Sequence, residues 1–386
     1  MNILHVNSNY TFTKLHAELI EKLERPEINN TIFMPHSGTS KAVIDANKHK
    51  NLYSKKTFNN IERYFFYLKQ KKIFKMLRET INLNNINLVH AHTLFTDGYV
   101  ALKIFKKYNI PYVVTVRNTD INLFFKKRLL LRSTGIEILN NASAITFLSE
   151  SYFNQTFNNY LSEKDKKRNI NKSYIIPNGI NKEWHNNNNL KKKKNEEIIK
   201  IVYVGRINKN KNILATIKAS EILIEKGYKV EFRVIGANEN DTIMNEINKR
   251  DFISYEPNKT LQELIEVYRE EDIFVMPSFY ESFGLVYAEA MSQGLPIIYT
   301  ENQGFDNQFE DGLVGFRVNP VNSEMISEKI LALWRNYDYF SENSLNNANK
   351  FDWEKIANKY SSIYLEIYNN RLEAFKLCDE NEEGNL

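Results

Sequence analysis

Residues 276–296 read MPSFYESFGLVYAEAMSQGLP, and they join a predicted buried strand to a predicted helix. The apolar run from Asp272 to Met276 is typical of a strand in a parallel sheet. Helix-forming residues with apolar spacing follow from Leu285 to Ser292, and Gly294 stops them. The helix therefore begins at a Ser-Phe-Gly turn. Its free N–H groups and positive dipole end are predicted to face an anion at the carboxyl edge of the sheet.

Two carboxylates bracket this turn, Glu281 and Glu289, eight positions apart. Helical geometry places their backbones roughly 12 Å apart, whereas a glycosidase pair needs about 5–10 Å between its carboxyl groups. The distance suits hydroxyl groups at opposite ends of a nucleotide-sugar whose diphosphate lies between them. The alternative is that Glu281 caps the helix and Glu289 is merely solvated.

A second loop carries two cations. The apolar run from Ile198 to Val204 predicts a strand, and Gly205 lets the chain turn sharply at its end. Arg206 and Lys211 follow, and with the helix start they are suited to hold two phosphates. In a lysine-rich protein the alternative is a solvated loop. Two such loops on one sheet favour the phosphate interpretation over either loop alone.

Composition limits the class of protein. A chain of 386 residues with 42% hydrophobic residues is long enough for two domains with cores of their own. The single cysteine, Cys378, allows neither a disulfide framework nor a cysteine metal site, which fits a reducing compartment. The N-terminus has no signal-peptide pattern, and no run approaches the roughly 18 apolar residues of a membrane span. We expect a cytoplasmic protein.

The charge is unevenly distributed. Residues 1–185 hold 28 Lys and Arg against 14 Asp and Glu, and the remainder holds 24 against 33. In the first part, basic clusters stand near aromatic residues, as in Lys69–Lys72 beside Tyr64–Tyr67 and Lys126–Arg128 beside Phe124–Phe125. Such a surface suits an anionic membrane face or a polyphosphate. The alternative is compositional bias. No nucleic-acid motif accompanies the charge, so we expect no nucleic-acid partner.

Strand and helix patterns alternate along the chain, which predicts an α/β fold with two doubly wound parallel sheets. The predicted strands are 3–6, 32–34, 86–92, 111–116, 144–148 and 173–177, and then 198–204, 229–235, 252–254, 272–276, 295–299 and 314–318. The polar run Asn186–Lys194 marks the boundary region. We expect domains over 1–183 and 184–352, with an amphipathic helix over 353–377 that packs back on the first domain.

His90 and His92 end one predicted strand on the same side, a pattern that raises the question of a metal ion. No cysteine and no third ligand nearby in sequence support a metal site. We therefore expect polar contacts lining a cleft or structural histidines, and no metal. The chain also lacks the G-x-G-x-x-G and Walker patterns, so dinucleotide and Walker-type phosphate sites are not indicated.

The chain resembles glycosyltransferase family 4. The matching residues are Val204-Gly205-Arg206 with Lys211-Asn212, Arg233–Gly236, Pro277-Ser278 leading into Glu281-x7-Glu289, Gly294-Leu-Pro296 and Pro177-Asn-Gly179. The resemblance spans essentially the whole chain and is most specific over 200–320. It implies a retaining transferase with the GT-B fold, in which two Rossmann-like domains face a central cleft.

The resemblance also implies roles for residues. Arg206 and Lys211 would bind the donor diphosphate and stabilise the charge of the leaving group, and Glu281 would hold hydroxyls of the donor sugar. Glu289 would hold the ribose. The rest of the implied donor set is Gly205, Gly236, Ile253, Ser282, Phe283, Gly284 and Leu285, of which Gly236 and Ile253 would border the base. No metal or other cofactor would be needed, because the cations and the helix end take that part.

The chain departs from the family at three places. Where many members have a histidine, this chain has Arg117, with Asp120 just beyond, so an acidic acceptor group is one interpretation. The first loop, Asn7–Asn9, lacks the usual glycines, and the common aspartate after Asn178-Gly179-Ile180 is Asn181. The acceptor-side candidates are Asn9, His92, Arg117, Asp120 and Asn178.

We therefore expect transfer of a sugar from a nucleotide-sugar, with retention, to a glycan or lipid-linked acceptor in bacterial surface polysaccharide biosynthesis. An anionic membrane surface at the basic N-terminal domain is the further expected partner. Two alternatives remain: a nucleotide-sugar epimerase, which would act without acceptor, and a non-catalytic sugar-nucleotide-binding module. The intact Arg206, Lys211, Glu281 and Glu289 argue against the second.

Overall fold

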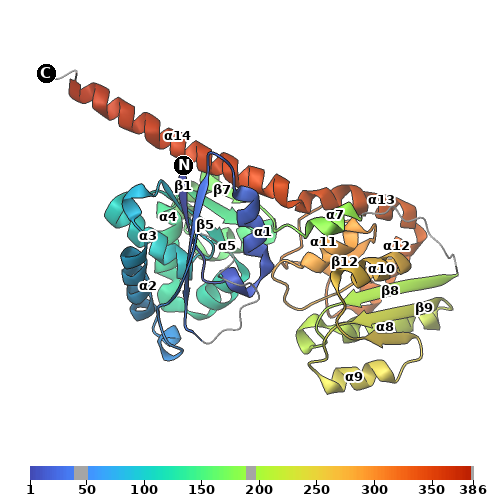
Figure 1. Ribbon diagram of the computed structural model, residues 1–386. Coiled ribbons are helices and arrows are strands. Elements are labelled where there is room, and N and C mark those ends of the chain that lie inside the picture. The colour runs from blue at the N-terminus through green and yellow to red at the C-terminus, as the bar shows by residue number, and fades with distance from the viewer. Residues whose placement is uncertain (39–50, 188–196, 384–386) are drawn as a thin grey trace. The chain divides into compact units, whose positions relative to one another are not determined.

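The computed structural model describes residues 1–38, 51–187 and 197–383, with side chains as far as residue 373. The chain forms two compact units, Met1–Leu148 with Tyr152–Pro177 and Trp353–Leu386, and Ser149–Ser151 with Asn178–Asp352 (Figure 1). The predicted boundary after residue 183 runs through α7 (Lys182–Asn186), which clusters with the second unit. The predicted polar run Asn186–Lys194 lies, from residue 188 onward, outside the described residues.

Seven parallel strands form the sheet of the first unit within the described residues, in the order β3-β2-β1-β4-β5-β6-β7. Their bounds are β1 (Asn2–Val6), β2 (Asn29–His36), β3 (Leu52–Lys56), β4 (Leu88–Ala91), β5 (Tyr112–Val116), β6 (Ala144–Phe147) and β7 (Ser173–Ile175). Strands β4, β5 and β6 are buried along their whole length, which explains why they stand out as apolar runs. The sequence did not predict β3, an edge strand whose two lysines are exposed.

The helices of the first unit connect these strands. They are η1 (Tyr10–Phe12), α1 (Lys14–Leu23), η3 (Ile61–Tyr64), α2 (Phe66–Thr80), η4 (Leu83–Asn85), α3 (Thr96–Tyr108), the π-helix η5 (Asp120–Phe125), η6 (Leu129–Leu131), α4 (Arg132–Asn141), α5 (Glu150–Tyr160), α6 (Glu163–Asn169), η7 (Ile170–Lys172) and α14 (Trp353–Glu383). The strand order reverses between β1 and β4, so the loops after these two strands lie at the switch point where such sheets bind ligands.

The C-terminal helix α14 belongs to the core of the first unit. Its buried residues, among them Ile356 and Tyr364, pack with Leu19 and Leu23 of α1 against strand residues such as Leu88 (Figure 1). The spacing of its apolar residues gives α14 one buried stripe. Its first residues therefore contribute directly to the stability of the first sheet.

Six parallel strands form the second sheet in the described part of the chain, in the order β10-β9-β8-β11-β12-β13. Their bounds are β8 (Ile198–Val204), β9 (Lys229–Ile235), β10 (Ile253–Glu256), β11 (Ile273–Val275), β12 (Ile297–Thr300) and β13 (Gly315–Val318). This order again reverses, here between β8 and β11. Two doubly wound parallel-sheet units confirm the predicted fold class.

The helices of the second unit are α7, η8 (Lys209–Lys211), α8 (Ile213–Glu225), α9 (Asp241–Asn248), α10 (Leu261–Glu270), α11 (Leu285–Ser292), α12 (Ser323–Arg335), α13 (Tyr337–Ala348) and η9 (Asn349–Phe351). Helix α11 has the bounds that the sequence predicts. Among the helices described in both units, none has the length and apolar content needed to cross a bilayer.

Replacing Ile356 by alanine tests the packing of α14. Ile356 is 1% exposed within the core of the first unit, so we expect Ile356→Ala to lower the free energy of unfolding by about 2–5 kcal/mol in urea titrations. The matched control is Lys359→Ala, one turn further on the exposed side of the helix. Equal effects of the two changes would mean that α14 does not pack as described.

Candidate functional site

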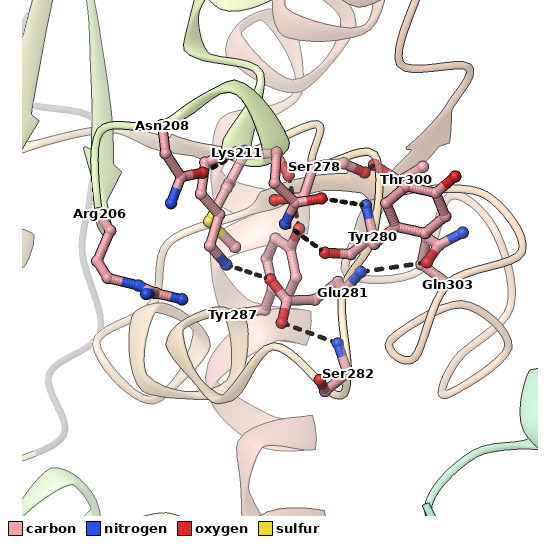
Figure 2. A network of polar contacts seen from close by, with 12 residues as sticks. Arg206, Asn208, Lys211, Ser278, Tyr280, Glu281, Ser282, Tyr287, Thr300 and Gln303 are labelled. Atoms are coloured by element: carbon pink, nitrogen blue, oxygen red, sulfur yellow. Dashed lines mark hydrogen bonds and ion pairs between the residues drawn. The ribbon is translucent and has the colours of Figure 1, made fainter. Parts of the chain in front are cut away.

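The loop after β8 is held at two glycines. A Cβ on Gly236, where φ is +148°, would lie 1.9 Å from the carbonyl oxygen of Gly205, so no other residue fits. The hydroxyl of Tyr203 donates to the carbonyl oxygen of Arg206 at 2.8 Å. These contacts fix the backbone from which Arg206 projects. Its guanidinium is 66% exposed, forms an ion pair with Glu239 at 3.3 Å and points toward Lys211 (Figure 2).

The turn η8 joins this loop to the loop after β11. The side chain of Asn208 accepts a hydrogen bond from the N–H of Lys211 at 3.2 Å and so begins the turn. Asn212 then takes the left-handed conformation, with φ of +53°. Its amide donates to the carbonyl oxygens of Pro277 at 3.1 Å and Pro320 at 2.7 Å. The side-chain amide of Asn212 therefore ties the loop after β8 to backbone carbonyls of the loops after β11 and β13.

Lys211 and Glu281 form the central contact of this site. The ammonium nitrogen lies 2.5 Å from Oε2, and the side chains are only 16% and 12% exposed (Figure 2). Glu281 also accepts the N–H of Ser282 on Oε1 at 3.0 Å, and its own N–H donates to Gln303 at 3.1 Å. A pair so shielded from water is screened little by salt. The predicted phosphate-binding cation and the predicted sugar-binding carboxylate thus meet directly.

Helix α11 begins beside Glu281 with its positive end open. Gly284 precedes the helix with φ of +80°, and it supplies no side-chain cap in the described structure. The first N–H groups of a helix have no partner within it, so they are available to an anion. A Cβ on Gly284 would lie 2.4 Å from the ring of Tyr287, whose hydroxyl is bonded to the carbonyl oxygen of Met276. Glycine is therefore required here.

The remaining donor-side candidates from this stretch lie on or next to α11. Ser282 is exposed, but the side chain of Phe283 is 3% exposed and packs among aromatic rings, so only its backbone faces the turn. Leu285 is the first residue of the helix, and Glu289 lies one turn later, half-buried.

The structure does not bring Ile253 to this edge. The predicted strand was 252–254, whereas β10 runs from Ile253 to Glu256 and pairs Ile253 with Phe232. The N–H of Gly236 instead donates to the carbonyl oxygen of Glu256. Glu256 is therefore the β10 residue at the carboxyl edge. The error came from a short strand without clear periodicity, which left its register open.

Asp120 organises the switch point of the first unit. Its carboxylate accepts the N–H groups of Leu94, Phe95 and Arg117 at 2.9–3.1 Å, which joins the loops after β4 and β5. Burial nevertheless raises the pKa of Asp120 to about 6, and the hydrogen bonds oppose this. Arg117 donates through Nε to the carbonyl oxygen of His92 at 2.7 Å, and burial lowers its pKa. Asp120 and Arg117, two of the predicted acceptor-side candidates, thus lie in direct contact.

The first unit has a pocket of about 390 Å³ at this edge, lined by Asn9, Arg117 and Asp120 among others. His92 is buried behind it, and its carbonyl oxygen rather than its ring holds Arg117. Asn178 belongs to the second unit. The acceptor-side set is therefore only partly gathered within one unit.

Sequence reasoning missed Asp97, which holds the first loop. Its buried carboxylate accepts the hydroxyl of Ser8 at 2.6 Å and the hydroxyl of Thr93 at 3.0 Å. Burial raises the pKa of Asp97 to about 7. The sequence signal that could have identified Asp97 was its place in the first turn of the helix that follows a buried strand. The glycine-free loop Asn7–Asn9 is thus held by the side chain of Asp97.

The predicted histidine pair is part of a larger buried cluster. Nδ1 of His5 lies 3.0 Å from Nε2 of His92, and His5, His90 and His92 are close enough to hold a metal ion. His90 already contacts Thr115 at 3.0 Å and Tyr364 at 2.6 Å. Burial lowers the pKa of all three rings. The geometry is that of neutral histidines hydrogen-bonded within the core.

Two family descriptions match this chain. Residues 182–350 match Glycosyl transferases group 1, and residues 15–184 match Glycosyltransferase Family 4. Together they account for both units apart from the ends of the chain. Both families consist of sugar-transferring enzymes by their descriptions.

Individual relatives share only a minor part of their sequence with this chain. An uncharacterized 41.2 kDa protein in the cps region of Klebsiella pneumoniae is 26% identical over 94% of this chain and 99% of its own length. The capsular polysaccharide biosynthesis glycosyltransferase CapM of Staphylococcus aureus is 34% identical over 42% of each chain. Anabaena HepE in complex with UDP superposes with a TM-score of 0.70 at 14% identity, over 94% of this chain and 99% of its own. The structural likeness establishes the two-unit fold.

Replacing Gly284 by alanine tests the start of α11. We expect Gly284→Ala to destabilise the second unit more than Gly227→Ala, measured by urea unfolding. Both positions have positive φ, which costs an alanine about 1–2 kcal/mol. Only at Gly284 does the added Cβ meet a ring, because nothing lies within 4 Å of a Cβ at Gly227. Equal losses would show that the ring of Tyr287 yields freely.

Proposed function

We propose, from the premise that this chain belongs to glycosyltransferase family 4, that it moves a sugar from a nucleotide-sugar donor to an acceptor with retention of configuration. One observation carries the proposal. At the switch point of the second sheet, the Lys211–Glu281 pair lies beside the open end of α11 and near Arg206. A diphosphate and a sugar require this combination of cations, free N–H groups and a carboxylate.

The cations act on the leaving group. When the bond from the sugar C1 to the diphosphate oxygen breaks, negative charge gathers on the phosphate. Lys211 and the N–H groups of α11 stabilise that charge because they are held in place before the reaction begins, and Arg206 adds a positive charge from the neighbouring loop. Fixed positive charge of this kind supplies what a metal ion supplies in other phosphate sites. We therefore propose that transfer needs no metal and no other cofactor.

Glu281 positions the sugar rather than attacking it. Its carboxylate is held by Lys211 and by the N–H of Ser282, so it is suited to accept hydrogen bonds from sugar hydroxyls. Glu289 would bind the ribose, and Gly236 would border the base. The acceptor oxygen then attacks C1 on the face that the phosphate leaves, and the acceptor proton passes to a phosphate oxygen. The new glycosidic bond retains the configuration of the donor.

The relatives suggest the biological setting. CapM acts in capsular polysaccharide biosynthesis, and the Klebsiella relative is encoded in a cps region. HepE has been solved with UDP-glucose, which supports a nucleoside diphosphate sugar as donor.

We propose that this enzyme extends a glycan or lipid-linked acceptor of a bacterial surface polysaccharide at the inner face of the cell membrane. The net positive charge of residues 1–185 suits contact with that anionic surface. The matching families are transferases, so the epimerase alternative is not favoured.

Donor binding is measurable without knowing the acceptor. We expect at least one of the UDP-, GDP- and ADP-sugars to raise the melting temperature. Arg206→Ala should weaken the binding of that nucleotide-sugar by about tenfold or more, because a charge-assisted contact to phosphate is lost. Lys209→Ala is the control, since Lys209 lies in the same loop and is exposed. An unchanged thermal shift in Arg206→Ala would remove Arg206 from the donor site.

A further inference from the structure

Lys69 of α2 is a buried cation that forms no direct ion pair with a carboxylate among the described residues. Its side chain lines the 390 Å³ pocket of the first unit, and the residue is only 9% exposed. Within the residues that the structure describes, its ammonium has no ion pair or hydrogen bond, and it lies over the ring of Phe58 at 5.3 Å. An unpaired buried charge is costly. A ligand anion in this pocket would offset that cost.

Three arginines line the same pocket, and none forms an ion pair with a carboxylate in the described parts of the chain. Arg63 donates to the hydroxyl of Ser37 at 2.9 Å, and Arg128 lies over the ring of Phe124 at 5.4 Å. Arg117 uses only Nε on a carbonyl oxygen. Donors of these guanidinium groups therefore remain for a ligand, and such groups match phosphate geometry.

The carboxylates nearby are engaged in hydrogen bonds with other groups. Asp120 is bound by three N–H groups, and Asp97 by the hydroxyls of Ser8 and Thr93. Burial lowers the pKa of Lys69 to about 8. Asp97 opposes this shift, and the positive charges of Arg128 and Arg63 add to it. Near neutral pH the ammonium is thus still charged, and its surroundings are those of a cation-rich pocket.

Exposed apolar side chains lie on the segments that line this pocket. Leu123 is itself part of the lining, and the others, on η3, the start of α2 and η6, are Ile61, Tyr64, Phe65, Tyr67, Leu68, Leu129 and Leu130. Helix α2 and η5 adjoin, because the ring of Phe66 packs against that of Phe124 at 6.1 Å and both residues line the pocket. Leu130 is 92% exposed. Apolar patches of this kind mark contact with a partner or a membrane.

We propose that this pocket binds the phosphate or diphosphate of a lipid-linked acceptor, with Lys69 and the three arginines on the anion and the exposed apolar side chains of the neighbouring segments on the hydrocarbon chain. The proposal rests on the proposed function, because it names the acceptor of that same enzyme. Charge complementarity selects a phosphate-bearing ligand. The adjoining apolar side chains select an amphiphile over a soluble sugar phosphate.

Farnesyl diphosphate below its micellar concentration is the probe, with inorganic pyrophosphate and farnesol as partial ligands. We expect calorimetry to show binding of farnesyl diphosphate that is tighter than that of pyrophosphate, and none of farnesol. Lys69→Met should weaken the binding of farnesyl diphosphate by at least about tenfold, since a charge-assisted contact is lost while the side-chain volume stays similar. The control Lys75→Met removes an exposed charge on the same helix and should change nothing.

The contribution of the exposed apolar side chains is tested by Leu130→Ser in η6. This change should weaken farnesyl diphosphate but leave pyrophosphate unchanged, and Val321→Ser, an exposed position of the second unit, should affect neither. Equal affinity of wild type for farnesyl diphosphate and pyrophosphate would overturn the lipid part and leave a soluble phosphate as the ligand class. Unchanged binding in Lys69→Met would overturn the site itself.

Nucleotide binding, measured in the same variants, separates this proposal from the donor assignment. Lys69→Met should keep the wild-type thermal shift with the nucleotide-sugar, which also shows that the variant is folded. A wild-type protein that binds farnesyl diphosphate but no nucleotide would contradict the proposed function and leave this site standing. The reverse result would overturn the acceptor proposal alone.

Discussion

The buried contact between Lys211 and Glu281 is the interaction on which the second unit's site depends. It joins two loops that leave neighbouring strands at the point where the strand order reverses. Removing either partner would leave a largely buried charge alone, which is strongly destabilising. Asn212 supports the same junction through backbone carbonyls. The site is therefore preorganised by contacts that exist before any ligand arrives, which is what charge stabilisation in a transition state requires.

The two units differ in the charged groups that they place at the switch points of their sheets. Both are doubly wound, and both gather polar residues where the strand order reverses. In the second unit a carboxylate and a lysine neutralise each other and face a helix end. In the first, Asp97 and Asp120 accept hydrogen bonds from backbone and hydroxyl groups, and Lys69 and the three arginines form no direct ion pair with a carboxylate in the described part of the chain. The uneven charge of the sequence thus reflects a local arrangement as well as composition.

The sequence predicted the fold and the bounds of several elements well, because long apolar runs and helix stop signals are local features. Helix α11 and strands β8 and β9 have the predicted bounds. Ile253 was misplaced because a four-residue strand carries too little pattern to set its register. The contact between Lys211 and Glu281 and the isolation of Lys69 were not predictable, since both depend on which distant loops meet. Asp97 had a local signal, an acidic residue in the first turn of α3, but its contact with Ser8 depends on a distant loop.

The division of labour between Lys211 and Glu281 is the central claim, and one calorimetric comparison tests it most directly. The affinities of the stabilising nucleoside diphosphate and of its sugar conjugate are measured for wild type, Lys211→Met and Glu281→Gln. We predict that Lys211→Met weakens both ligands alike, whereas Glu281→Gln weakens only the conjugate, so that the ratio of the two Kd values moves in that variant alone. A ratio that stays at the wild-type value in Glu281→Gln would contradict the account.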